Sequence, residues 1–302
     1  MDHRTVRIGV RDHVYDISGR WLKTARPDDE WFEDVEDPES IVAALEQSPA
    51  RADLFSFWQR LPFTEPRYSY CLDWEQVAVL PVRTYDDWYH TQINNKTRNL
   101  IVKAQRKGVT VRMSAFTDDF VRGMTAIFNE TPIRQERPFW HYGKTFETIR
   151  REFSRYLFRE QLIGAYLGDE LIGFIMLAHA GRYAWIGQII SMVRHRDKSP
   201  NNLLMAKAVE VCAEQQLPYL VYAYWPRGTL REFKRHNGFS CVKLPRYHVP
   251  LSAKGALALQ LGLHRSPVDR LPERAIGVLR DLRARFYTIR YRSQLQRLGN
   301  AD

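Results

Sequence analysis

A lysine in the segment LREFKRHNGF, residues 230–239, stands where its charge could do chemistry. Leucine and phenylalanine residues at helical spacing predict a short helix with one apolar face, and Asn237 with the glycine after it predicts the end of that helix. Lys234 directly follows Phe233, which we expect to face inward. Lys234 is therefore either one cation on a solvated helix face or an ammonium that points at an anionic centre.

The segment NETPIRQERPFWHYGK, residues 129–144, is the densest cluster of polar and aromatic side chains in the chain. Carboxylates and imidazoles can be tuned to take a proton near neutral pH, and arginine pairs can grip an acidic or phosphorylated group. The alternative is a surface loop held down by its aromatic residues. The candidates for acid–base chemistry are Glu130, His141 and Tyr142, and those for substrate binding are Arg134, Gln135, Arg137 and Lys144.

A second anion-binding candidate is the segment HRDKSPNN, residues 195–202, which precedes a long apolar helix pattern. Ser199 is expected to cap that helix and Pro200 fits its first turn. Unpaired N–H groups and the positive end of the helix dipole then favour a phosphate group. The alternative is an ordinary Ser-Pro helix start with solvated cations. The candidates for binding the phosphate are Lys198, Ser199, Asn201 and Asn202.

One helix is predicted over residues 84–108, and its second part, NKTRNLIVKAQRKG at residues 95–108, is basic. Such a charge run is usually a solvated face. It could otherwise contact the backbone of a tRNA or an anionic glycan carrier, and Arg98 is the residue we assign to substrate binding there.

Composition narrows the classes of protein. The chain has 302 residues, 44% of them hydrophobic, eight tryptophans and a net charge of +10, which predicts a folded protein with an anionic partner. Its three cysteines are scattered, which argues against a disulfide framework or a zinc site and predicts a protein without metal in a reducing cytoplasm. The motifs of serine hydrolases, nucleotide triphosphatases and zinc proteases are missing from the sequence, and nothing matches a DNA-reading motif.

No signal peptide is visible, and the longest apolar stretch, LIGFIMLAHA, is far shorter than the ~20 residues that span a bilayer. We therefore expect a cytoplasmic protein. The last part of the chain, from residue 254, has ten Lys and Arg against four Asp and Glu. Its apolar residues fall on one predicted helix face, which docks onto the protein body or, alternatively, onto the anionic inner face of a membrane. That face contains Ile276, Leu279, Leu282, Phe286 and Ile289.

The hydrophobic periodicity predicts an α/β (α+β) fold built on a mixed, largely antiparallel sheet flanked by helices. Residues 1–60 are expected to be irregular apart from one short helix, and residues 67–82 to form two strands joined by a turn. The order that follows is helix, three antiparallel strands, helix, strand, helix, strand. We predict an N-terminal extension at 1–83, a catalytic domain at 84–251 and a basic helical tail at 252–302.

This order of elements over residues 84–250 resembles the GNAT acyltransferase superfamily. The hairpin IGAYLGDELIGFIMLA, the segment HRDKSPNNLLMAKAVE and the segment FKRHNGF carry the resemblance. Two departures, DKSPNN in place of a glycine-rich donor loop and Lys234 in place of a tyrosine, are similar to the FemAB-like branch, which includes peptidoglycan aminoacyltransferases. The N-terminal extension is then a candidate for a partial second GNAT unit.

The resemblance implies transfer of an acyl group, probably acetyl, from acyl-CoA to the amine of a small molecule, peptide or glycan. Lys234 would face the reacting carbonyl or the departing thiolate or ribose oxygen. Backbone N–H groups between residues 188 and 192 would polarise the carbonyl. Two alternatives stay open: an aminoacyl-tRNA-dependent transferase, or an inactive binding module tethered by its tail. The donor-binding candidates that complete the site are Gln188, Ile190, Met192 and Asn237.

Overall fold

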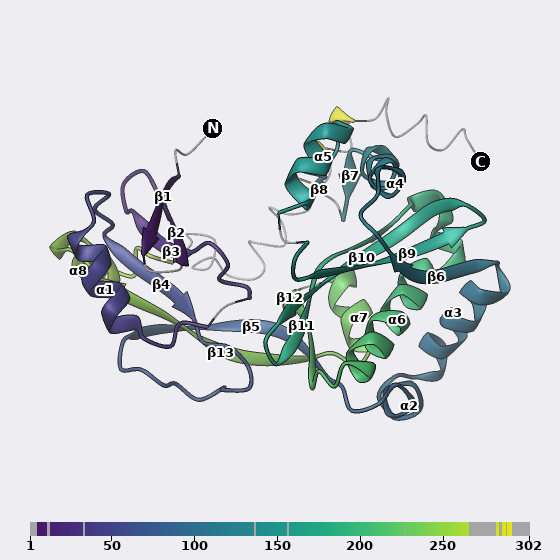
Figure 1. Ribbon diagram of the computed structural model, residues 1–302, viewed down its shortest axis with the longest axis horizontal. Helices are drawn as coiled ribbons and strands as arrows, with labels where there is room; N and C mark the ends of the chain where they lie inside the picture. The colour runs from purple at the N-terminus through teal and green to yellow at the C-terminus, as the bar shows by residue number, and fades with distance from the viewer. Residues whose placement is uncertain are drawn as a thin grey trace.

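The structure is a computed structural model that describes residues 5–10, 13–32, 34–135, 137–155, 157–226 and 228–265, with short pieces at 282–283, 286–287 and 289–291. In these residues one sheet of eleven strands runs through the whole molecule, in the order β1-β2-β3-β4-β13-β5-β12-β11-β10-β9-β6 (Figure 1). The strands are β1 (Val6–Val10), β2 (His13–Ser18), β3 (Thr24–Pro27), β4 (Leu54–Trp58), β5 (Cys71–Pro81), β6 (Val109–Ser114), β9 (Glu160–Leu167), β10 (Glu170–Ala180), β11 (Tyr183–Ser191), β12 (Tyr219–Tyr224) and β13 (Ser240–Pro250). A separate small ribbon pairs β7 (Ile133–Arg134) with β8 (Arg137–Pro138).

Helices cover both faces of the sheet at the β6–β12 end. In Figure 1, α4 and α5 lie on one side of β10, and α3, α6 and α7 lie on the other. Because both faces are covered, β10 is buried along nearly its whole length and reads as a continuous apolar run. The helical segments are α1 (Pro38–Gln47), α2 (Tyr85–Asp87), the π-helix η1 (Trp88–Gln92), α3 (Asn95–Arg106), α4 (Asp118–Asn129), α5 (Phe146–Phe153), the 3-10 helix η2 (Val193–Lys198), α6 (Pro200–Glu214), α7 (Thr229–His236) and α8 (Ala253–Gln260).

Buried apolar side chains form a large core around β10, α4 and α6 and a smaller aromatic core under β1 to β4. Strands β5 and β13 run through both regions and pair antiparallel over nine positions. The sheet is therefore continuous across residue 83, where the sequence predicted the end of an N-terminal extension.

Three sequence predictions about local structure are wrong. Residues 1–60 are not irregular, since β1 to β4 extend the sheet there. Residues 71–81 form one strand rather than two. The first part of β5 is exposed or partly buried and most of its second part is buried, so no single alternation of exposed and buried residues runs along the strand. The helix expected from residue 84 to 108 is interrupted before α3, where Asn94 starts a new helix by accepting a hydrogen bond from the Thr97 N–H, 2.9 Å away.

The C-terminal tail is described only in part. α8 packs against β13, and its N-cap is Ser252. Leu282, Phe286 and Ile289 are more than half exposed, so the prediction that this face docks onto the protein body is wrong for these three residues. Ile276 and Leu279 lie outside the described residues. Within the described part of the chain, every helix is too short or too polar to cross a membrane.

Candidate functional site

Strands β11 and β12 diverge in the middle of the sheet. They pair in parallel at three positions only, the last being Trp185 with Val221. β12 then bulges at Ala223, whose φ is 47°, and continues toward β5, where Trp225 N–H donates to the carbonyl of Gln76 at 2.7 Å. The second half of β11 is therefore left without a partner on that side. This is the splayed gap that the resemblance led us to expect after the hairpin.

The direction of the β11 backbone groups decides which of them face the gap. Met192 N–H donates to the Ile172 carbonyl at 2.8 Å, so it is used within the sheet. In an antiparallel strand the backbone N–H groups of alternate residues point in the same direction. The N–H of Ile190 therefore also points to β10, and the N–H groups of Ile189 and Ser191 point into the gap. Within the predicted range 188–192, the N–H groups of Gln188, Ile190 and Met192 therefore point to β10 and cannot reach a carbonyl in the gap, so their assignment as backbone donors is corrected. The Ser191 carbonyl confirms this direction, since it accepts a hydrogen bond from a side chain beyond the gap, Arg134, at 2.8 Å.

A cavity of about 520 Å³ opens at this gap. It is formed by β11, the start of α6, the β7–β8 ribbon and one side chain each from β12 and α7. Among the sequence candidates it brings together Gln188, Ile190, Met192, Ser199, Asn201, Asn202, Arg134, Gln135 and Arg137. Tyr222, Phe233, Trp140 and Arg196 complete much of the remaining wall.

Lys234 is buried at 1% exposure behind the cavity wall, next to the lining residues Tyr222 and Phe233, and does not line the cavity itself. Its ammonium donates to the carbonyl of Tyr222 and, at 2.8 Å, to that of Tyr224, and it lies 3.9 Å from the centre of the Tyr222 ring. Burial lowers the pKa of Lys234 to about 7. The two carbonyls and the ring stabilise its charged form. Of the two interpretations of this lysine, the solvated helix face is wrong.

The start of α6 is a poorer phosphate cradle than the sequence predicted. Ser199 is the N-cap residue of α6 and Pro200 begins the helix, as predicted, but Ser199 adopts a left-handed conformation with φ of 56° and its side chain makes no capping hydrogen bond. Pro200 has no N–H, and the Asn202 N–H donates to the Ser199 carbonyl at 3.1 Å. The Lys198 ammonium lies near His195 and Asp197 and does not line the cavity.

Glu130 holds the chain in place rather than facing the cavity. Its carboxylate accepts hydrogen bonds from the N–H groups of Val193 at 2.5 Å and Arg194 at 3.0 Å, and it pairs with Arg134 at 3.2 Å. Arg134 also donates to the Ile127 carbonyl at 2.9 Å. With its oxygens occupied by the segment after β11, Glu130 is badly placed to act as a base, and that interpretation is corrected.

His141 is part of the core. Its ring stacks on Phe128 with centroids 4.3 Å apart, and neither ring nitrogen has a hydrogen-bond partner. Burial lowers its pKa to about 4, so it stays neutral, but its nitrogens do not reach the cavity. Its neighbours Tyr142 and Lys144 are also outside the cavity wall, and the Lys144 ammonium pairs with Glu152 at 2.5 Å. These three residues do not line the cavity, so the structure does not bring them together with the other candidates.

Two further candidates are structural. Arg98 donates to the carbonyls of Tyr89 at 2.8 Å and Ile93 at 2.7 Å, and so closes the end of η1. Asn237 is fully buried at the end of α7, where its amide donates to the Phe233 carbonyl at 2.8 Å. Neither residue lines the cavity, so Arg98 is corrected as a substrate-binding residue and Asn237 as a donor-binding residue.

Sequence reasoning missed Glu160. This residue begins β9, and its carboxylate lies 3.8 Å from where a Cβ on Gly187 would be, at the point where β11 leaves β12. Burial raises its pKa to about 7, against a weaker opposing effect of Arg159. A glutamate at the start of an apolar strand pattern, opposite a strand glycine, is the signal that could have identified it.

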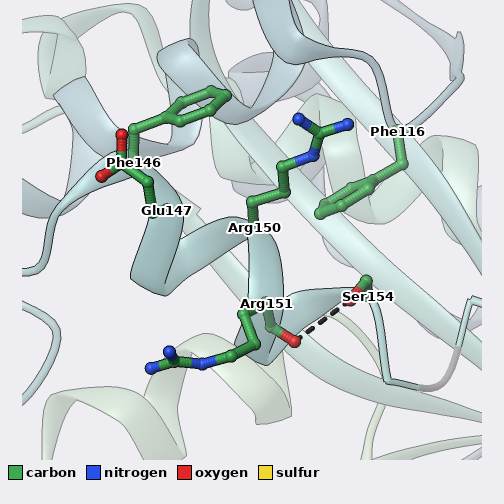
Figure 2. A pocket seen from close by; sticks show the side chains of 6 residues that line it. All are labelled: Phe116, Phe146, Glu147, Arg150, Arg151 and Ser154. Atoms are coloured by element: carbon green, nitrogen blue, oxygen red, sulfur yellow. Dashed lines mark hydrogen bonds between the residues drawn. The ribbon is translucent and has the colours of Figure 1, made fainter.

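Another hollow, of about 390 Å³, lies against α5 (Figure 2). Figure 2 shows Arg150 between Phe116 and Phe146, while Arg151 points away from them. Arg150 pairs with the exposed Asp118 at 3.2 Å. This surface contains none of the residues that the sequence selected, and its central cation, Arg150, is paired with Asp118, so we place the candidate site at the gap.

No protein-family model and no curated protein matches this sequence. Several solved structures match its fold. FemX is 12% identical, with a TM-score of 0.50 over 81% of this chain and 87% of that one. L-PGS from Bacillus licheniformis is 13% identical, with a TM-score of 0.55 over 80% and 83%. The C-terminal domain (DUF2156) of a putative lysylphosphatidylglycerol synthetase from Agrobacterium fabrum is 12% identical, with a TM-score of 0.58 over 85% and 87%. The chain therefore has the GNAT-type, FemAB-like fold, as the sequence predicted.

Proposed function

We propose that this chain is an acyltransferase whose activated carbonyl binds in the gap between β11 and β12. One observation carries the proposal. The buried Lys234 ammonium lies beside the vertex of the gap, the point where β12 leaves β11, and the Ile189 N–H points into the same gap. A backbone N–H and an ammonium that are already fixed in a dry site stabilise the oxyanion that forms when a nucleophile attacks a carbonyl. The likeness to FemX and to the lysylphosphatidylglycerol synthetase domain is consistent with such chemistry.

In this reaction the acceptor amine attacks the carbonyl carbon and a new C–N bond forms. The tetrahedral intermediate then collapses, and the bond to the carrier oxygen or sulfur breaks. Lys234, whose pKa is about 7, gives a proton to the departing atom. Glu160, whose pKa is also about 7, takes a proton from the attacking amine across the space next to Gly187. The two groups exchange protons with solvent after each turnover.

Aminoacyl-tRNA is the donor that the site favours. A CoA pyrophosphate would need free N–H groups at the start of α6, where Pro200 has none and the N–H of Asn202 is engaged. A ribose ester needs no such cradle, and the net charge of +10 suits a nucleic-acid carrier. Acyl-CoA remains the second candidate, because Arg196 and the first turn of α6 do line the cavity.

The acceptor side is cationic. Arg137 and Arg196 line the cavity, and Arg137 is exposed on the β7–β8 ribbon. We therefore propose an amine acceptor that carries an acidic or phosphorylated group, on a small molecule, a peptide or a glycan.

Binding measurements separate the two donors. The full chain is titrated with aminoacyl-tRNA, deacylated tRNA, acetyl-CoA and longer acyl-CoAs, by calorimetry and by thermal shift. We expect binding of aminoacyl-tRNA that weakens steeply with salt, and slow release of the amino acid to added amines. Saturable binding of acyl-CoA alone would favour the second donor. If no donor binds, the chain is an inactive module with the same fold, and the proposed function is wrong.

A further inference from the structure

A cluster of two histidines and an aspartate lies far from the gap, beside α8 at the left of Figure 1. Asp73 is on β5, His248 is on β13, and His264 follows α8. In the register of β5 and β13, Cys71 stands opposite His248, and Asp73 is two residues further along β5 on the same face. The pairing of the two strands therefore brings Asp73 and His248 together, and the turn after α8 adds His264.

The distances within this cluster suit a metal ion. His264 Nε2 lies 3.1 Å from Asp73 Oδ2, His248 Nε2 lies 3.5 Å from the same oxygen, and the three ligand atoms are all within 4.8 Å of one another. Ligand atoms around a tetrahedral zinc ion, each about 2.0 Å from it, are about 3.3 Å apart. Two of the three separations already match, and a small rotation of the imidazoles closes the third.

Among the described residues, no hydrogen bond accounts for the buried ring of His248. Its side chain is 8% exposed, yet neither ring nitrogen makes a hydrogen bond, although Nε2 points toward Asp73. Buried polar groups are nearly always satisfied, so one that is unpaired and directed into a cluster of ligands calls for an explanation.

The neighbouring arginines do not block the site. Arg265 donates to Asp73 Oδ1 at 2.6 Å and, over a longer distance, to Oδ2 at 3.3 Å, and so fixes the orientation of the carboxylate, whose Oδ2 also faces the two histidines. Arg246, next along this face of β13, pairs with Glu30 at 3.1 Å and with Glu75 at 3.2 Å. The charge of Arg246 is therefore balanced by Glu30 and Glu75, outside the three proposed ligands.

We propose that Asp73, His248 and His264 bind a divalent transition-metal ion, Zn²⁺ by the nature of the ligands, and that this ion clips the segment after α8 to the sheet. Cysteine spacing predicted no metal site, since two of the three ligands lie more than 170 positions beyond the first and none is a cysteine. Cys71 and His264 also line a hollow beside these three residues. The clip does not depend on the proposed acyltransferase activity.

The test uses untagged full-length protein that has been treated with chelator and desalted. Zn²⁺ is titrated against a chromophoric competitor, and Co²⁺ is followed by its visible spectrum. We expect one equivalent of Zn²⁺ to bind with a Kd below roughly 1 μM, and Co²⁺ to give the intense bands of a tetrahedral site. His264→Ala should weaken binding by at least about 100-fold, and His264→Cys should restore much of it. His13→Ala, which removes an exposed histidine of β2, is the matched control and should change nothing.

A second measurement reports on the clip itself. Zn²⁺ should slow trypsin cleavage after Arg265 in the wild type but not in His264→Ala, and circular dichroism checks that the variant is folded. Equal Zn²⁺ affinity in wild type and His264→Ala would overturn the proposal, as would the absence of stoichiometric binding. If the wild-type protein bound Zn²⁺ as expected but showed no acyl transfer, the result would count against the function proposed above and not against the metal site.

Discussion

The ammonium of Lys234 donates a hydrogen bond to the backbone carbonyl of Tyr222 and lies 3.9 Å from the centre of the ring of that same residue. Tyr222 immediately follows the last paired residue of β12, where that strand leaves β11. One residue of α7 is thereby tied to the vertex of the gap. A lysine held in this way is fixed in position before any substrate arrives, which is what oxyanion stabilisation requires.

Replacing this lysine tests the centre of the proposed mechanism. Lys234→Met keeps the length and apolar stem of the side chain but removes the charge. We expect the rate of acyl transfer to fall about 10²- to 10³-fold, with donor binding changed little, because the charge acts mainly in the transition state. Single-turnover kinetics with saturating donor measure this. Arg235→Met, which removes an exposed cation paired with Glu232, is the control. Equal, small losses in the two variants would remove Lys234 from the mechanism.

The pH dependence of the rate should be bell-shaped and centred near pH 7. Burial raises the pKa of Glu160 to about 7, so the rate rises as this carboxyl loses its proton. Burial lowers the pKa of Lys234 to about 7, so the rate falls as this ammonium loses its proton. The Glu160→Gln variant should transfer the acyl group slowly, and its rate should no longer rise with pH on the acidic side of the profile.

The matched control for that experiment is Glu170→Gln. Glu170 begins the neighbouring strand β10 and pairs with Arg194 at the surface. Its removal should leave both limbs in place. An acidic limb that survives in Glu160→Gln would show that another group takes the proton.

Glu130 is expected to contribute to stability rather than to the chemical step. Glu130→Ala leaves the largely buried Arg134 guanidinium and two N–H groups without their acceptor. The free energy of unfolding should fall by about 3 kcal/mol, measured by urea denaturation. Glu152→Ala, which breaks the half-exposed pair with Lys144, should cost less than about 1 kcal/mol. If Glu130→Ala were as stable as wild type but inactive, the role of Glu130 as a base would have to be reinstated.

His141 should be replaceable by a similar apolar ring. His141→Phe keeps the stacking on Phe128 and removes two ring nitrogens that have no partner. We expect activity to be retained and the free energy of unfolding at pH 7 to be unchanged within about 1 kcal/mol, or higher. A large loss of activity in this variant would contradict the structural role.

The same histidine has a signature in the pH dependence of stability. Its pKa is lowered from 6.5 to about 4 by burial, so between these values the unfolded chain binds more protons than the folded one. Stability is therefore lost as pH falls through this window, by up to about 3 kcal/mol for the wild type. His141→Phe should lose this part of the slope. Urea denaturation at pH 4.5, 5.5 and 7 compares the two proteins.

Much of the fold was predictable where local pattern and tertiary environment agree. The hairpin strands β9 to β11 and helix α6 are long apolar runs bounded by turn residues, and the structure has them where the sequence placed them. The four N-terminal strands were missed. β1 to β3 are short and partly exposed, so they carry little pattern of their own, and β4 is a fully buried run of only five residues. They are strands because β13 continues far enough to pair with β4.

The site was predictable in outline and not in its individual roles. The segments 134–140 and 188–202 do line one cavity, and Lys234 is buried next to Tyr222, which lines it too. Glu130 and His141 looked like proton acceptors by type, but a carboxylate that accepts two backbone N–H groups and an imidazole stacked in the core are occupied elsewhere. Glu160 was missed because only the sheet brings its carboxylate beside Gly187.

The amino-acid sequence alone determined the period of each central element, the end of α7 at Asn237 and the presence of a lysine behind Phe233, because these depend on neighbours along the chain. Only the tertiary structure decided which N–H groups of β11 face the gap, which carboxylate lies at its vertex, and that Asp73, His248 and His264 meet. Those facts depend on strand register and on contacts between residues far apart in sequence. A shift of one residue in register would turn the strand side chains Glu160, Asp73 and His248 to the other face of the sheet.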